Sequence, residues 1–360
     1  MAFDTALSGL VLQHFRQHSS LTLQFPTQST VITGPNASGK TTIFEALVML
    51  STGNSFRAGK VEEMILFDTE LARCKAKVLH EGESDEVEVI VTRGVVQGKR
   101  TQHRLFSLNG VKKRKKDAIG KFFTVLFRPE DMRLIEGSPA RRRNYLDAPL
   151  SVLHREYAAS LKTYEQTLKR RNKLLQQVRE GEQPRASLQY WNMSLIKHGT
   201  VLQRHRKEFL GTFSQVAFPV NFSVHYNASV ISEERIQTYL HKEIAAGHTL
   251  IGPHKDDISI DITIDREMDI SRYGSRGQQR LAVLWLKYCE LSYIQKTSGQ
   301  RPVLLLDDIM SELDTDSQSV VLNTIARYQS IITSTDPSVA ALVIQHLSEK
   351  AVTLHTFTKT

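Results

Sequence analysis

A glycine-rich loop between an expected strand and an expected helix carries the clearest chemical signal. Residues 34–41 read GPNASGKT, with a β-branched run at 30–33 before them and an apolar run at 43–50 after them. In this GxxxxGK[ST] spacing, backbone N–H groups surround phosphate oxygens, Lys40 reaches the β- and γ-phosphates, and the Thr41 hydroxyl binds Mg²⁺. We therefore predict an ATP site. Its expected contacts here are Gly34, Asn36, Ala37, Ser38, Gly39, Lys40, Thr41 and Thr42.

A site of this kind needs a second half, a buried strand that ends in carboxylates. The run Pro302 to Leu306 is apolar throughout and is followed by Asp307 and Asp308. We expect Asp307 to bind Mg²⁺ together with Thr41, and Asp308 to polarise the attacking water. A helix-capping role for Asp308 is the alternative. The predicted catalytic groups are Lys40, Asp307 and Asp308.

Three further segments narrow the type of ATPase. Residues 275–280, SRGQQR, open an expected helix and resemble the LSGGQ signature of ATP-binding-cassette proteins, with Arg276 in place of the first glycine. In that class the signature contacts the γ-phosphate held by a second subunit, and the residues that correspond here are Ser275, Gly277 and Gln278. A simple helix N-cap is the alternative. Ser311 and Asp314 lie where a D-loop is expected. Thr335 stands where transporter-type ATPases usually have a histidine.

The order of expected elements indicates a core made from both ends of the chain. Residues 86–91 alternate as a strand does, and Asn109-Gly110 favours a tight hairpin turn. Residues 157–207 have helical spacing, interrupted by loop-forming residues at 180–184, and strand-like alternation resumes at 257–264. We predict an α/β fold: residues 1–150 form the N-terminal half of a P-loop ATPase head with a β-rich lobe, 151–215 an inserted helical arm domain, and 216–360 the C-terminal half.

The charge of the chain favours a polyanionic partner. Lys and Arg number 47 against 38 Asp and Glu, which gives a net charge of +9 over 360 residues. Part of the excess is clustered in short runs, although such runs are also common on solvated faces. The predicted DNA contacts are Lys112, Lys113, Arg114, Lys115, Lys116, Lys169, Arg170 and Arg171. Another run, Arg141 to Arg143, serves instead as a candidate nucleotide-sensing loop.

Other sequence features restrict the class of protein and its expected cellular compartment. No window reaches the roughly 18 consecutive apolar residues of a membrane span, and the first residues lack the pattern of a secretion signal, so we expect a cytoplasmic protein. The two cysteines, Cys74 and Cys289, do not form a CxxC pair. We interpret them as core thiols rather than as zinc ligands or a disulfide.

Taken together, these residues resemble the RecF family, bacterial relatives of the SMC and Rad50 heads, over essentially the whole chain. Two blocks are more specific than the ATPase motifs: 127–139 with Arg141 to Arg143 and Asp147, and 252–257, GPHKDD. Ala37 and Lys255 depart slightly from the pattern, where glycine and arginine are usual. The resemblance implies the head of an ATP-binding-cassette ATPase.

What the resemblance implies about activity is specific. Such a protein binds ATP and Mg²⁺, forms a homodimer on ATP, holds double-stranded or gapped DNA, and releases it by slow hydrolysis. Its partners are RecR and RecO, and together they help to load RecA onto single-stranded DNA covered by single-strand-binding protein (SSB), in recombinational repair and the SOS response. By analogy with related heads, Arg16 contacts ATP.

Three rival interpretations predict different features. A transporter subunit would carry the switch histidine, which Thr335 replaces, and a structural SMC-like protein would need heptads sustained over a hundred or more residues. A nucleotide-dependent nuclease would need a further acidic metal-binding domain. The only extra acidic pair near a histidine is Asp256-Asp257, for which a strand-start or salt-bridge role is the simpler interpretation.

Overall fold

The computed structural model describes residues 5–26, 28–80, 82–264 and 266–358. The chain divides into two compact units, Met1–Met132 with Leu286–Thr360 as the first and Arg133–Trp285 as the second. In sequence, the second unit therefore lies between the two parts of the first. It contains residues 151–215, for which the sequence predicts a helical arm domain, together with a small sheet and further helices that pack onto the two long helices.

The first unit contains an antiparallel sheet whose strand order is β2-β1-β4-β5-β8-β9. Its turn between β8 and β9 is made by Asn109 and Gly110, both with positive φ (53° and 75°), as the predicted tight hairpin requires. A short hairpin, β6-β7, follows β5. The strands are β1 (Thr5–Phe15), β2 (His18–Gln24), β4 (Leu71–His80), β5 (Glu83–Thr92), β6 (Val95–Val96), β7 (Lys99–Arg100), β8 (Arg104–Leu108) and β9 (Val111–Lys113).

A parallel sheet in the same unit carries the nucleotide motifs, with strand order β10-β14-β15-β3-β16. Because all the pairings are parallel, the carboxyl ends of β3, β14 and β15 lie at one edge, where ligands bind in open α/β sheets. The strands are β3 (Ser29–Thr33), β10 (Thr124–Phe127), β14 (Val303–Asp307), β15 (Ser330–Ser334) and β16 (Val352–Thr356). The helices of this unit are α1 (Lys40–Thr52), α2 (Lys115–Ala118), α10 (Thr315–Ile325) and α11 (Ser338–Leu347).

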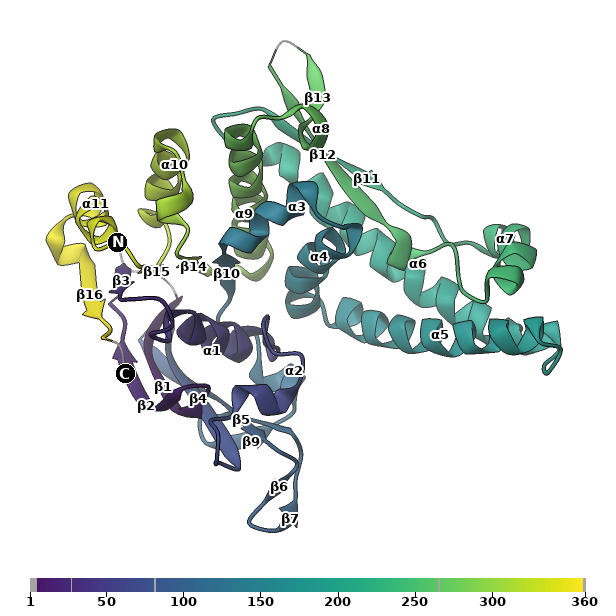
Figure 1. Cartoon of the computed structure of the whole chain (residues 1–360), viewed down its shortest axis with the longest axis horizontal. Coiled ribbons are helices and arrows are strands. Elements are labelled where there is room, and N and C mark those ends of the chain that lie inside the picture. The colour runs from purple at the N-terminus through teal and green to yellow at the C-terminus, as the bar shows by residue number, and fades with distance from the viewer. Residues whose placement is uncertain (1–4, 27, 81, 265, 359–360) are drawn as a thin grey trace. The chain divides into compact units, whose positions relative to one another are not determined.

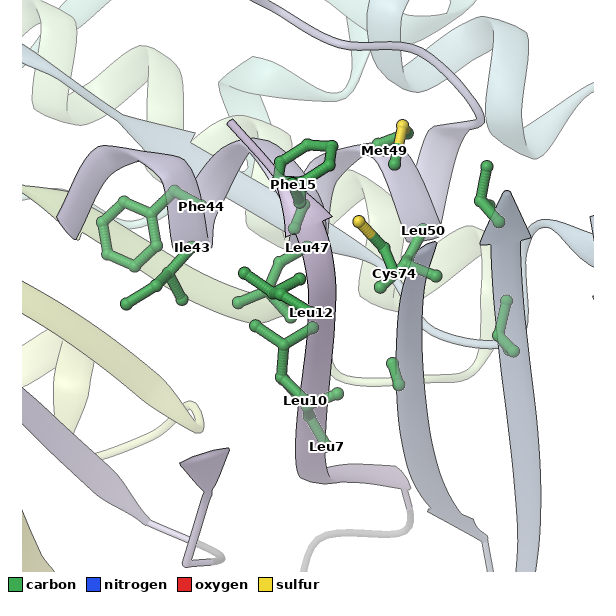
Figure 2. Close-up of a cluster of buried hydrophobic side chains, with 14 of the residues drawn as sticks. Leu7, Leu10, Leu12, Phe15, Ile43, Phe44, Leu47, Met49, Leu50 and Cys74 are labelled. Carbon is green, nitrogen blue, oxygen red and sulfur yellow. The ribbon is translucent and has the colours of Figure 1, made fainter. Parts of the chain in front are cut away.

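Helix α1 fixes the position of the glycine-rich loop by burying its apolar side in the core of the first unit. Figure 2 shows Leu47 of α1 next to the leucines of β1 and Leu50 of α1 beside Cys74 of β4, and Ile43 belongs to the same buried cluster. The inward residues of β4 include Ala72, Cys74 and Ala76, all fully buried, and such small side chains let a helix lie close to a sheet. Each buried leucine contributes roughly 1.5–3 kcal/mol through the hydrophobic effect. The loop is thereby anchored at its helical end.

The second unit consists of long helices and a three-stranded sheet, with order β11-β12-β13. Helices α5 and α6 lie side by side, joined by the turn predicted at 180–184, and α7 packs against both (Figure 1). The elements are α3 (Arg133–Glu136), α4 (Pro139–Leu153), α5 (Arg155–Arg179), α6 (Gln189–Gly211), β11 (Phe222–Asn227), α7 (Glu233–Ala246), β12 (Asp257–Thr263), β13 (Glu267–Asp269) and α8 (Ile270–Tyr273). Helix α9 (Arg276–Ser298) begins in the second unit and ends in the first.

The structure bears on the state of the two cysteines and on the presence of a membrane-spanning helix. Cys74 and Cys289 are both buried free thiols, as the absence of a paired motif indicates, and burial raises the pKa of each. Among the described residues, no helix is long and apolar enough to cross a membrane.

Candidate nucleotide-binding site

The glycine-rich loop runs from the end of β3 to the first residue of α1, Lys40. Ala37 and Gly39 have left-handed backbones, with φ of 66° and 94°. A Cβ at position 39 would lie 2.4 Å from the ring of His18, and the left-handed backbone would strain any side chain there. Ala37 adopts a conformation that costs a non-glycine residue roughly 1–2 kcal/mol. Ala37, which replaces the usual glycine, nevertheless adopts the left-handed conformation that the curled loop requires.

The loop gathers donors suited to phosphate. Lys40 Nζ donates to the carbonyl oxygens of Gly34 (2.7 Å) and Pro35 (2.9 Å). Burial lowers the pKa of Lys40, and the carboxylates of Asp308 and Asp307 oppose this shift. Ser38 Oγ is buried and has no hydrogen-bond partner in the described part of the chain. An unpartnered buried hydroxyl is costly, and a phosphate oxygen would satisfy it. The loop thus fits the triphosphate that its sequence predicts.

The magnesium side of the site is formed by α1 and the end of β14. Thr41 Oγ1 donates to Asp307 Oδ1 at 3.2 Å, and Thr333 Oγ1 donates to the same oxygen at 2.8 Å. Burial raises the pKa of Asp307, while the two hydroxyl donors oppose the shift. A hydroxyl and a carboxylate in contact are ligands of the type that Mg²⁺ prefers. Thr41 and Asp307, distant in sequence, are therefore brought together as predicted, and they fit this cation.

Asp308 has an unexpected partner. Its backbone is left-handed (φ 52°), and its Oδ1 accepts from the backbone N–H of Thr335 (3.1 Å) and from the Thr335 hydroxyl (3.4 Å). Neither contact caps a helix, so these bonds do not give Asp308 the helix-capping role that was the alternative prediction. Thr335 occupies the position where transporters have a histidine, and here it orients the second carboxylate. The sequence indicated both positions but not the bond between them.

The turn between β1 and β2 lies against the loop, which sequence reasoning did not foresee. Gln17 Nε2 donates to the carbonyl of Ala37 at 2.9 Å, and the His18 ring lies within 3.4 Å of the Gly39 carbonyl. The predicted ATP contact Arg16 has a different partner in the structure. Its guanidinium makes two bonds, of 2.9 and 2.7 Å, to Glu45, whose side chain is fully buried in α1. Arg16 thus ties this turn to the helix that follows the loop.

Glu45 had no signal in the sequence as a functional position, because it sits within an apolar helical run. Its Oε1 also accepts from Ser55 Oγ at 2.6 Å. A buried carboxylate without charged partners is strongly unfavourable, and Arg16 supplies the compensation here. The bond between them keeps the β1–β2 turn over the phosphate loop.

The signature segment forms a reciprocal cap at an exposed helix start. Ser275 Oγ accepts from the backbone N–H of Gln278 (3.3 Å), and Gln278 Oε1 accepts from the backbone N–H of Ser275 (2.8 Å). The N-cap interpretation therefore describes the free chain, in the arrangement of a capping box. Ser275 is exposed and Gly277 is partly so. The exposed position of Ser275 is compatible with a contact to nucleotide bound by a second subunit, and that contact stays a prediction.

The D-loop residues follow β14. Ser311 is exposed, and its Oγ donates to the Asp308 carbonyl at 3.3 Å. Asp314 caps α10, because its side chain accepts from the backbone N–H of Ser317 at 2.8 Å. Ser311 is thereby linked to the backbone of Asp308. Asp314 instead stabilises the N-terminus of α10 within the single chain.

The first basic run lies on β9 and α2, at the edge of the antiparallel sheet. Lys112, Lys113, Arg114 and Lys116 are exposed. Lys115 differs from them: it donates to Asn54 Oδ1 at 3.0 Å, and burial followed by the nearby Arg104 lowers its pKa to about 8. We therefore retain the exposed members of the run as DNA candidates and regard Lys115 as partly structural.

In the second run the prediction for Arg171 is wrong. Lys169 and Arg170 are exposed on α5, but the side chain of Arg171 has no exposed surface. Its guanidinium donates to Glu243 (2.6 Å), Thr249 (2.7 Å) and Asn192 (2.7 Å). Successive helical residues point about 100° apart, so these three side chains span about 200° of the helix surface, and Arg171 falls on the packed side. Arg171 binds α5 to its neighbours instead of DNA.

Arg142, Arg143 and Asp147 of the first family-specific block meet the second block, 252–257, inside the second unit. Arg142 makes a two-pronged bond to Asp257 (2.6 and 2.9 Å), and Arg143 donates to the Asp256 carbonyl. The buried Arg206 lies between Asp147 (2.7 Å) and Asp256 (2.9 Å). The salt-bridge interpretation of Asp256-Asp257 is confirmed. Both blocks hold this unit together, and in the described structure Arg142 and Arg143 are engaged within it.

Comparison with known proteins agrees with this architecture. The RecF/RecN/SMC N-terminal domain family matches residues 6–352. The DNA replication and repair protein RecF of Lachnospira eligens is 33% identical over 344 residues, which cover 91% of this chain and 92% of that protein. Two structures of the recombination mediator protein RecF in the RecFOR pathway, RecF-ATPrS and RecF-ATP, align with TM-scores of 0.84 and 0.82. In both the identity is 30%, and 94% of each chain is covered.

The agreement extends over nearly the whole length and includes both the P-loop core and the inserted unit. The fold of this chain is that of the P-loop ATPase head expected from the motifs. One of the similar structures is described as RecF-ATP. The chain belongs to the RecF family of ATP-binding DNA replication and repair proteins.

Proposed function

We propose that this protein is a switch in which ATP closes two copies into a homodimer that holds DNA, and slow hydrolysis releases it. The observation that supports this most directly is the pairing of a complete P-loop and Asp307 site with a signature segment in one chain. Ser275 sits exposed at the start of α9, a long helix whose N-terminus favours anions. Nucleotide held by one copy would then be completed by Ser275, Gly277 and Gln278 of the other.

Each residue of the site has a distinct part in this scheme. Lys40 moves from the Gly34 and Pro35 carbonyls to the β- and γ-phosphates, and the Ser38 hydroxyl gains the partner that it lacks. Thr41 and Asp307 would hold Mg²⁺, and the ion would supply positive charge to neutralise the phosphates. Asp308, oriented by Thr335, accepts a hydrogen bond from the attacking water. A carboxylate one methylene shorter than glutamate is consistent with slow turnover.

DNA binding in this proposal is governed by phosphate contacts. The exposed lysines of β9 and the exposed Lys169 and Arg170 of α5 provide sequence-independent attraction, which is steeply dependent on salt. Closure of the dimer doubles the number of basic patches that can engage one duplex. We infer that double-stranded and gapped DNA are the substrates, and that hydrolysis is stimulated by DNA.

The partners in this proposal follow from the family. Solved relatives are described as recombination mediators in the RecFOR pathway. By that likeness the ATP-bound dimer on DNA would recruit RecR and RecO, which help to load RecA onto single-stranded DNA covered by SSB in recombinational repair and the SOS response.

Replacing Ser275 with alanine is expected to abolish ATP-dependent dimerisation while changing ATP affinity of the monomer less than about twofold. The hydroxyl belongs to the signature, which in the proposed dimer contacts only nucleotide bound by the partner copy. Sedimentation with ATP and Mg²⁺ measures the first effect, and titration with a fluorescent ATP analogue the second. Ser271→Ala, an exposed serine in the preceding helix, is the control. If Ser275→Ala loses ATP binding as a monomer, the trans-contact is wrong.

Replacing Lys112 and Lys113 together with alanine is expected to weaken DNA binding in the ATP state. Each lost phosphate contact reduces the magnitude of the slope of log K against log salt by about 0.9, so the loss of two lysines from each copy should reduce it by about 3.6 in the dimer. Fluorescence anisotropy with a labelled duplex at several salt concentrations measures it. Lys60→Ala, a single exposed lysine outside the basic runs, should leave the slope unchanged. An unaltered slope in the double variant would exclude β9 from the DNA interface.

A further inference from the structure

The three-stranded sheet of the second unit has one apolar and one polar face. Val224, Ile260 and Ile262 alternate with polar neighbours along the strands, and the two isoleucines are buried. The opposite face carries His225 on β11, Asp261 on β12 and Glu267 on β13. The strands are hydrogen-bonded in the order β11-β12-β13. Each strand therefore places one of these side chains beside that of its neighbour.

Strand register brings these three side chains to one point. Asp261 pairs with Ser223, two residues before His225, and Glu267 pairs with Thr263, two residues after Asp261. His225 Nε2 lies 2.9 Å from Asp261 Oδ2 and 3.4 Å from Glu267 Oε1. All three ligand atoms lie within 4.8 Å of one another. Ligands of a tetrahedral zinc ion, each about 2.0–2.2 Å from the metal, are themselves roughly 3.3–3.6 Å apart.

The cluster brings together more ligand-type groups than a simple ion pair does. Two carboxylates converge on a single imidazole nitrogen, Nε2 of His225. Ser223 Oγ donates to Glu267 Oε1 at 2.9 Å, which orients that carboxylate as outer-shell partners of metal ligands do. The side chain of Asp261 is 17% exposed, whereas those of His225 and Glu267 are 50% and 55% exposed. The open side leaves room for water as a fourth ligand.

We propose that His225, Asp261 and Glu267 bind a divalent transition-metal ion of the zinc type, at a site separate from the nucleotide. One nitrogen and two oxygen ligands favour Zn²⁺ over Mg²⁺, which prefers an all-oxygen shell. The ion would clamp β13 to β11 and β12. Since β13 leads directly into α8 and then to Ser275, it would also fix the segment that precedes the signature. The site is a structural one, and no chemical step is assigned to it.

The test is calorimetric titration of the metal-free, nucleotide-free full chain with zinc chloride. We expect the triple variant His225→Gln/Asp261→Asn/Glu267→Gln to bind one equivalent fewer than the wild type, and each single variant to bind that equivalent at least about tenfold more weakly. All three side chains lie on the polar face, so the fold is expected to persist, which circular dichroism checks. The nucleotide site is intact in every variant and contributes equally to all of them.

His241→Gln, which removes an exposed histidine of α7, is the matched control and should keep the full stoichiometry. As a second readout, one equivalent of Zn²⁺ should raise the melting temperature of the wild type and not that of the triple variant. Identical titrations of the wild type and the triple variant, or no zinc binding by the wild type, would overturn the proposal.

Discussion

Replacing Asp307 with asparagine is expected to slow ATP hydrolysis by about 100- to 1,000-fold, the range seen when a single preorganised charge-stabilising group is removed. The amide oxygen of the new side chain could still accept the hydroxyl bonds from Thr41 and Thr333, so the strand end should keep its shape. The substitution removes the negative charge that would bind Mg²⁺ in the proposed site. Phosphate release at saturating ATP and Mg²⁺ measures the rate, and a nucleotide titration shows whether binding persists.

The matched control for this substitution is Asp316→Asn, which alters an exposed aspartate in the first turn of α10. Its hydrolysis rate should equal that of the wild type. If Asp307→Asn retained a rate within about threefold of the wild type, the magnesium would have to be held elsewhere. The assignment of the second half of the site to β14 would then fail.

Replacing Arg171 with leucine is expected to lower the free energy of unfolding by about 3–5 kcal/mol, because Glu243 would be left as an unpaired charge in a fully buried position. Asn192 and Thr249 would lose hydrogen-bond donors at the same time. Chemical denaturation of the full chain, followed by circular dichroism at the helical wavelength, measures the loss. Much of it should return in the double variant Arg171→Leu/Glu243→Leu, in which neither charge remains buried.

Lys169→Ala is the matched control for Arg171, since it removes a neighbouring positive charge that is exposed on the same helix. Its effect on stability should stay within about 0.5 kcal/mol. Equal effects of Lys169→Ala and Arg171→Leu on stability would contradict the buried ion pair and would restore Arg171 as a candidate for DNA contact.

The parts of the site that were predictable are those written in contiguous sequence. The loop at 34–41 and the apolar strand that ends at Asp307 each carry a local pattern tied to one conformation, and parallel pairing then places Thr41 beside Asp307. The helices of the arm and the Asn109-Gly110 turn were predictable for the same reason. In each case the residues that determine the structure are neighbours in the chain.

What could not be predicted depends on contacts between distant segments. Nothing local indicates that Arg16 bonds Glu45, that Gln17 reaches the phosphate loop, or that Thr335 orients Asp308. The error at Arg171 has the same origin, because a run of basic residues does not show which side of a helix will be packed. The extent of the second unit was also hidden, since β11 to β13 carry strand patterns like those of the core but, among the described residues, pair only with each other.

The central claim is that nucleotide controls both assembly and DNA binding. The most direct test is the mass of the protein in solution with and without ATP and Mg²⁺, using Asp308→Asn to slow turnover, followed by duplex binding under the same two conditions. The proposal predicts that the mass doubles and that tight DNA binding appears only with ATP. A protein that stays monomeric with ATP, yet binds DNA to the same extent with or without it, would contradict the account.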